Sequence, residues 1–175
     1  MESNRTFEFS GNSSDKTGIE IGNLAVSDDV TLNFTGETDT GIGVEQIAGK
    51  HLTVSDNGRF NVVGTATGSG TGVKIGGSIS TTGSGRVNIR GVSGTGAGVV
   101  LQGAITVSGG TLEITGSSTD GAGVHISKSG SLQTSGNSST RIFGNSVNKE
   151  GVENQGTISK TENSTLVICS SSHLP

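Results

Sequence analysis

The 175-residue sequence contains no Trp or Tyr, only five Phe and one Cys, and a single Pro at its last position. One Cys cannot form a disulfide within the chain, and no Cys/His cluster has the spacing of a zinc site. The longest apolar runs fall well short of 18 residues, which excludes a membrane-spanning helix. A formal charge of −4 argues against a general nucleic-acid binder. We therefore expect no metal, no cofactor, no nucleic-acid partner and no membrane insertion by this segment.

More than half of the chain is Gly, Ser, Thr or Asn, and these residues follow a repeat rather than a random order. A Gly followed by Ile or Val returns at spacings of 25, 29, 26, 25 and 28 residues, in the pairs that begin at Gly18, Gly43, Gly72, Gly98, Gly123 and Gly151. A flexible Gly/Ser linker has no such phase. A fixed period of this length is typical of solenoid proteins.

Each repeat contains three short runs in which apolar and polar residues alternate, which is the pattern of a half-buried strand. Examples are GVKIG at 72–76, AITVS at 104–108 and TLEITG at 111–116. Stacked repeats would align their inward residues into apolar ladders. The second run gives Leu24, Leu52, Ile79, Ile105, Leu132 and Ile158, and the third gives Phe9, Phe34, Val62, Ile89, Ile114, Ile142 and Ile168.

The sequence therefore predicts an all-β fold, a single-stranded parallel β-helix of about six coils. Each coil has three short strands and roughly 26 residues. Residues 1–169 form the predicted solenoid domain, which we expect to be a piece of a longer shaft, and residues 170–175 are expected to be an irregular tail. Unpaired end coils favour end-to-end association of such a piece.

The segments GTGVKIGGSISTTGSGRVNIRG and GAGVVLQGAITVSGGTLEITGSSTDGAGVHISKSGSLQTSGNSS resemble the β-helical shaft of filamentous-haemagglutinin-like exoproteins. They are also similar to the passenger domains of autotransporter adhesins. The resemblance covers about residues 5–168. It implies a right-handed solenoid, a secreted or bacterial cell-surface location with the export signal outside this segment, and an outer-membrane transporter as secretion partner.

The acidic, His and Cys residues are poorly placed for catalysis, and we expect no enzyme activity. Acid/base work on polysaccharides needs clustered carboxylates. Here residues 61–112 contain no acid at all, and Glu20 and Glu45 share an outward slot with Lys74 next in line. His51, His125 and His173 fall in different runs or in the tail. Cys169 follows an inward Ile, so it is expected to point outward without an activating base.

One group of Arg and Asn residues suggests a ligand-binding surface. Arg59 and Arg86 are predicted to occupy the same outward column on adjacent coils, with Arg90, Asn61 and Asn88 on the same face. Stacked like charges cost stability, which favours a role in binding an anionic glycan, although long Arg side chains can also extend into water at little cost.

Three functions are compatible with these features. The first is a structural shaft of an adhesin, with contacts to host glycans, matrix proteins or neighbouring cells. The second is a carbohydrate-active β-helix protein. The third is an ice-binding solenoid, which requires regular outward Thr arrays, whereas the outward slots here are irregular and partly charged.

Overall fold

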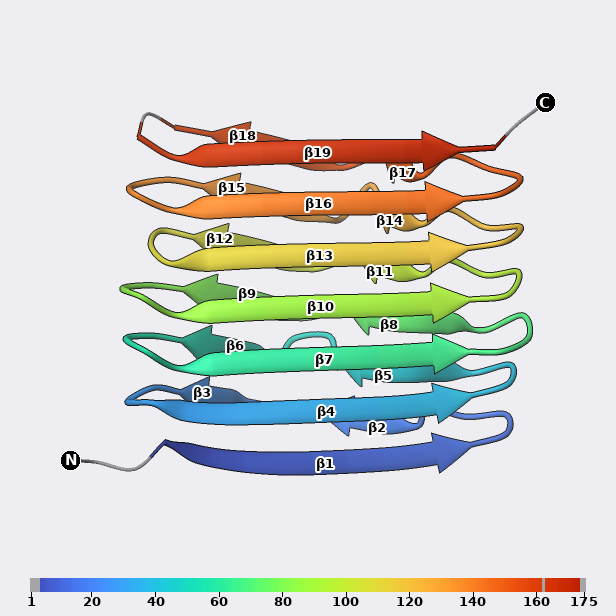
Figure 1. Ribbon diagram of the computed structural model, residues 1–175, viewed down its shortest axis with the longest axis horizontal. Coiled ribbons are helices and arrows are strands. Elements are labelled where there is room, and N and C mark those ends of the chain that lie inside the picture. Colours follow the sequence, from blue (N-terminus) through green and yellow to red (C-terminus); the bar gives the residue numbers. More distant parts are fainter. Residues whose placement is uncertain (1–3, 162, 174–175) are drawn as a thin grey trace.

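The computed structural model describes residues 4–161 and 163–173, and every regular element within them is a β-strand. Three parallel sheets stack coil on coil into a solenoid, called the rod below, and the chain visits them in a fixed order on each turn; the coils stack vertically in Figure 1, and the strands run along the longer, horizontal dimension. Sheet A consists of β1 (Arg5–Ser13), β4 (Val30–Thr38), β7 (Arg59–Ala66), β10 (Arg86–Ser93), β13 (Thr111–Ser118), β16 (Ser139–Ser146) and β19 (Thr165–Ser172). Sheet B consists of β2 (Ile19–Ile21), β5 (Ile42–Gln46), β8 (Thr71–Ile75), β11 (Val99–Leu101), β14 (Val124–Ile126) and β17 (Val152–Asn154). Sheet C consists of β3 (Leu24–Val26), β6 (His51–Val54), β9 (Ser78–Thr81), β12 (Ala104–Val107), β15 (Ser131–Thr134) and β18 (Thr157–Lys160).

This arrangement is the predicted parallel β-solenoid of about six coils. In Figure 1 the strands of sheet A run left to right in front, the chain returns behind them through sheets B and C, and each turn rises from the blue end to the red end. The winding is therefore right-handed, the hand that parallel crossovers favour. No described residue is helical, so this part of the chain holds no helix able to cross a bilayer.

Both predicted ladders are confirmed strand by strand. Leu24 pairs with Leu52, and the sheet C ladder continues in register to Ile158. The sheet A ladder runs in register from Phe9 to Ile168. The middle members are fully buried, whereas Phe9 and Ile168 remain more than 40% exposed because no described coil covers them. The core is thus a thin column of aliphatic side chains whose burial drives coil stacking.

Two facing columns of glycine hold sheet A close to sheet B. A Cβ on Gly64 or Gly91 would lie 2.0 or 1.9 Å from the carbonyl oxygen of Gly72 or Gly98, the glycine that precedes the first Val of the next sheet B strand. No side chain fits at that distance, so most glycines of the repeat serve close backbone approach rather than positive φ. Positive φ is adopted instead at a few turns, for example by Asp28, Asp29 and Asp56.

A buried hydroxyl column follows the sheet A glycines and organises the turns toward sheet B. Ser118 Oγ donates to the Gly96 carbonyl at 2.6 Å in the coil below and accepts from the Gly121 N–H at 2.9 Å. These bonds satisfy backbone groups that would otherwise be buried without partners. Ala66 replaces the hydroxyl in the coil whose turn is a residue longer.

The expectation of an irregular tail from residue 170 is wrong for residues 170–172. β19 continues to Ser172, pairing with β16 through Asn145↔Ser171 and Ser146↔Ser172. The apolar alternation of the third run stops at the closing Gly, but strands of sheet A extend two positions past it, where small hydroxyl residues carry no apolar signal. His173 follows the strand, and residues 174 and 175 lie outside the described part.

Candidate functional site

The outer face of sheet A is the broadest flat surface of the described rod, because its strands are eight or nine residues long whereas those of sheets B and C have three to five. Four columns of side chains point outward from it, two residues apart along each strand. Column 1 contains Arg59, Arg86, Thr111 and Ser139; column 2 contains Glu8, Asn33, Asn61, Asn88, Glu113 and Arg141; column 3 contains Thr35, Val63, Arg90, Thr115, Phe143 and Cys169; column 4 contains Glu37, Thr65, Val92, Ser117, Asn145 and Ser171.

The structure brings together four of the five residues singled out from sequence. Arg59 and Arg86 are directly paired on β7 and β10, as are Asn61 and Asn88. All four line one shallow hollow of about 220 Å³, together with Val87, Thr111 and Glu113. Arg90 lies on the same face but in column 3, between Val63 and Thr115, and does not line this hollow.

The amides of column 2 are partly committed to one another. Asn61 Nδ2 donates to Asn33 Oδ1 at 2.7 Å, and Asn33 Nδ2 donates to Glu8 Oε1 at 2.6 Å. Asn88 makes no side-chain hydrogen bond within residues 4–161 and 163–173, so its donors and acceptors remain open to a ligand. The end of the hollow near Asn88 and β13 is therefore the end at which side chains can hydrogen-bond to a ligand.

Two members of this surface do not follow from the residue types alone. Glu113 sits above Asn88 in column 2, and Arg141 sits above Glu113. Arg86, Glu113 and Arg141 line an adjoining hollow of about 270 Å³ with Thr111, Leu112 and Ser139. The signal that could have found them is the register, which puts all three on neighbouring coils. From residue types alone, column 2 is an irregular mixture of Asn, Glu and Arg. The structure shows that these side chains form a continuous surface of mixed charge.

Cationic residues are segregated by type. All five Arg lie on strands of sheet A, and all six Lys lie outside it, on turns or on sheets B and C. The ion pairs among the described residues use Lys74 with Glu45 and His125 with Glu153, both on sheet B. No guanidinium is ion-paired in that part of the chain. Because guanidinium presents a planar fork of donors suited to carboxylate or sulfate, this segregation favours anion recognition on sheet A.

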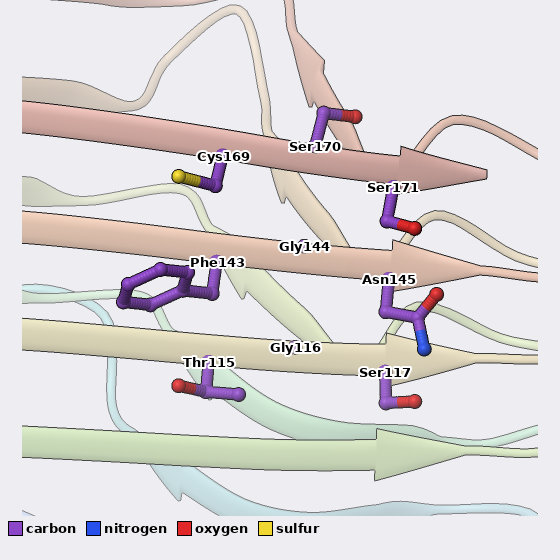
Figure 2. A pocket seen from close by; sticks show the side chains of 9 residues that line it. All are labelled: Thr115, Gly116, Ser117, Phe143, Gly144, Asn145, Cys169, Ser170 and Ser171. Atoms are coloured by element: carbon purple, nitrogen blue, oxygen red, sulfur yellow. The ribbon is translucent and has the colours of Figure 1, made fainter.

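Another hollow on the same face lies toward the top of the rod, across β13, β16 and β19. It has a volume of about 390 Å³ and is lined by Thr115, Gly116, Ser117, Phe143, Gly144, Asn145, Cys169, Ser170 and Ser171. Figure 2 shows the Phe143 ring, the Cys169 thiol and Thr115 on one side, and Ser117, Asn145 and Ser171 on the other. Cys169 is exposed and points outward as predicted.

The remaining sequence candidates lie apart from these hollows. Glu20, Glu45 and Lys74 share one outward column of sheet B, and Lys74 Nζ lies 2.9 Å from Glu45 Oε1, as expected for a partly compensated surface ladder. Higher in that column, His125 Nδ1 lies 3.0 Å from Glu153 Oε2. Slight burial raises the pKa of Glu153, but hydrogen bonds from Gln155 and His125 outweigh it, so the net pKa lies below its ordinary value. Across residues 4–161 and 163–173, no three His, Cys, Asp or Glu side chains gather as a metal site would require.

Comparison with known proteins adds no assignment: the chain matches no family model, and neither the curated proteins nor the solved structures give a match. A functional assignment for this chain therefore rests on the rod and its outer surface.

Proposed function

We propose that the chain is a shaft segment of a secreted or surface-exposed bacterial adhesin. The observation that carries this proposal is the rod itself. Three continuous parallel ladders and a fully buried aliphatic column make each coil rest on the next, so rigidity extends over the whole described length. At the strand spacing of about 4.8 Å, six coil steps span about 29 Å. Such a rod holds its outer faces at fixed positions away from an attachment point.

The second part of the proposal is that sheet A contributes a lateral binding surface for acidic glycans or matrix proteins. Its support is the cluster of Arg59, Arg86, Arg90 and Arg141 on β7, β10 and β16, where Glu113 is the acid in the adjoining hollows. The chain as a whole carries a charge of −4. A local positive field on an acidic protein steers anionic partners to one face.

The test is a binding screen on glycans and extracellular-matrix proteins with a charge-matched pair of variants. Arg59→Glu with Arg86→Glu reverses two charges in the hollow, and Lys50→Glu with Lys128→Glu makes the same change on exposed turns away from sheet A. We expect binding that weakens with added salt, is lost in the Arg variant and is kept in the Lys variant. Equal loss in both variants, or no binding by a folded protein, would refute the lateral surface and leave only the shaft.

Two further expectations complete the proposal. Export through an outer-membrane transporter rests on the resemblance to two-partner and autotransporter adhesins, and self-association between copies rests on the unpaired end coils. Self-association is open to a direct measurement. Multi-angle light scattering across a concentration series is expected to reveal assembly, since β1 and β19 each present one unpaired edge in the described part of the rod. A monomer at every concentration would contradict it.

A further inference from the structure

The hollow around Phe143 differs in chemistry from the arginine surface that adjoins it on sheet A. None of its nine lining residues carries a charge, although Arg90 and Arg141 stand on the same sheet. Its floor is the backbone of Gly116 and Gly144, whose inward sides pack against the glycines that precede sheet B strands. Because none of these side chains is charged, the hollow itself offers a ligand stacking and hydrogen bonds rather than an ion pair, and this lining complements a neutral ligand.

The two walls of the hollow are of opposite kinds. Phe143, a residue that is 37% exposed, presents its aromatic ring on this face, with the Cys169 thiol above it (Figure 2). Across the floor stand the amide of Asn145 and the hydroxyls of Ser117 and Ser171. One wall thus attracts a flat apolar surface, and the other offers hydrogen bonds.

The polar wall is not already committed. The side chains of Ser117, Asn145 and Ser171 form no hydrogen bonds within residues 4–161 and 163–173. They stand in register on three consecutive strands, at intervals of about 4.8 Å. By contrast, Asn33 and Asn61 on the same face are bonded along their column. Free donors and acceptors at this interval suit a ligand with several hydroxyl groups on one edge.

We propose that this hollow binds a neutral pyranose sugar. The C–H face of the ring lies on the Phe143 ring, and the hydroxyl edge bonds to Asn145 and the serines of column 4. The combination of an aromatic platform with a few convergent polar groups is the usual composition of a small-ligand site. The site adjoins the arginine surface but uses none of its guanidinium groups, and it does not depend on the adhesin assignment.

Cys169 provides a built-in reporter, because it is the single cysteine of the chain, is exposed, and lines the hollow. The experiment measures its alkylation rate by iodoacetamide with and without the methyl glycosides of glucose, galactose, mannose and N-acetylglucosamine. At least one glycoside is expected to slow alkylation in a saturable manner. Loss of the stacking surface in Phe143→Ala should raise the apparent dissociation constant by about tenfold.

The matched control is Val63→Ala. Val63 belongs to the same column as Phe143 and has the same exposed fraction, but it stands three coils away, outside the hollow. It should leave protection unchanged. Asn145→Ala, which removes the opposite wall, should also weaken protection, and circular dichroism checks that each variant keeps its β structure.

Several results would overturn the proposal. Absence of protection by every glycoside, or protection that persists in Phe143→Ala, would rule out the stacked sugar. Equal protection by cyclohexanol would show an apolar groove rather than a sugar site. Loss of protection in the Arg59→Glu/Arg86→Glu protein would place the sugar on the arginine surface. If this variant keeps the protection of Cys169 but loses the binding of acidic glycans, the result supports two independent sites.

Discussion

Thr81 carries the clearest energetic prediction of the fold. Its side chain is fully buried in sheet C, and its hydroxyl has no hydrogen-bond partner among the described residues. The residues directly below and above it in the same column are Val54 and Val107. Val has the shape of Thr, so Thr81→Val replaces an orphaned hydroxyl by a methyl group without changing the packing. An unsatisfied buried hydroxyl costs about 1–3 kcal/mol, and the Val variant should therefore be more stable by at least about 1 kcal/mol.

The same substitution two coils higher should have the opposite sign. Thr134 occupies the same column and is equally buried, but its Oγ1 lies 2.8 Å from Ser138 Oγ and accepts from Thr140 Oγ1 at 3.3 Å. Thr134→Val leaves the buried Thr140 hydroxyl without its acceptor, whereas Ser138 Oγ keeps its bonds to the Val107 and Ser135 carbonyls, so the change should cost about 1 kcal/mol. Urea unfolding followed by circular dichroism measures both changes, at an unchanged dependence on denaturant. A shift of the two variants in the same direction would refute the argument, because shape and burial are matched and only hydrogen bonding differs.

Two other perturbations test the backbone and the surface. Gly91→Ala should destabilise by about 3 kcal/mol or more, since the new Cβ would lie 1.9 Å from a carbonyl oxygen and neither backbone can yield cheaply; Gly22→Ala, with open space around the added atom, is the neutral control. Thermal unfolding compares them, and similar melting temperatures would contradict the close-packed glycine column. Because hydrogen bonds from Gln155 and His125 depress the pKa of Glu153 on folding, its ionised carboxylate contributes stability above the unfolded-state value of about 4.3, and this contribution fades as pH falls through the folded value. Glu153→Gln should flatten the stability profile in that acidic range, and an unchanged profile would contradict the linkage.

The ladders are predictable from sequence because two independent periods agree. Alternation by two fixes which side chains point inward, and the interval of 25–29 residues fixes which ones stack. These two periods alone place Phe34 and Val62 in one column, and the pairing of Arg59 with Arg86 follows from the same register.

Polar residues inside the rod do not follow from these periods. Gln46 lies between Ile21 and Ile75 in its column and is fully buried, because its amide donates to the Lys50 carbonyl at 2.9 Å and accepts from the Gly77 N–H at 2.7 Å. Burial of such a group depends on where the turns of neighbouring coils place their carbonyl groups. The alternation of apolar and polar residues does not encode that position. The buried hydroxyl of Ser118 escapes the sequence pattern for the same reason, because it bonds to the Gly96 carbonyl of a neighbouring turn.

The hollow at Phe143 is also absent from the sequence pattern, though its columns follow from the register. What the register does not supply is the space between columns, which depends on side-chain lengths on three consecutive strands. Inward and outward positions of this fold differ in how freely they can change. Inward positions are limited by the facing glycine columns and the thin aliphatic core, so they can vary little without the clashes that an added Cβ would cause.

Outward positions of sheet A carry no such restriction, and a change there leaves the ladders and the core intact. Column 3 accommodates Val63, Arg90 and Phe143 on the same backbone, with the same pairing from coil to coil. A solenoid of this kind can therefore vary its recognition chemistry one coil at a time. The neighbouring charged and uncharged hollows on one rigid face are the physical basis for our proposal that sheet A binds ligands while the rest of the coil supports it.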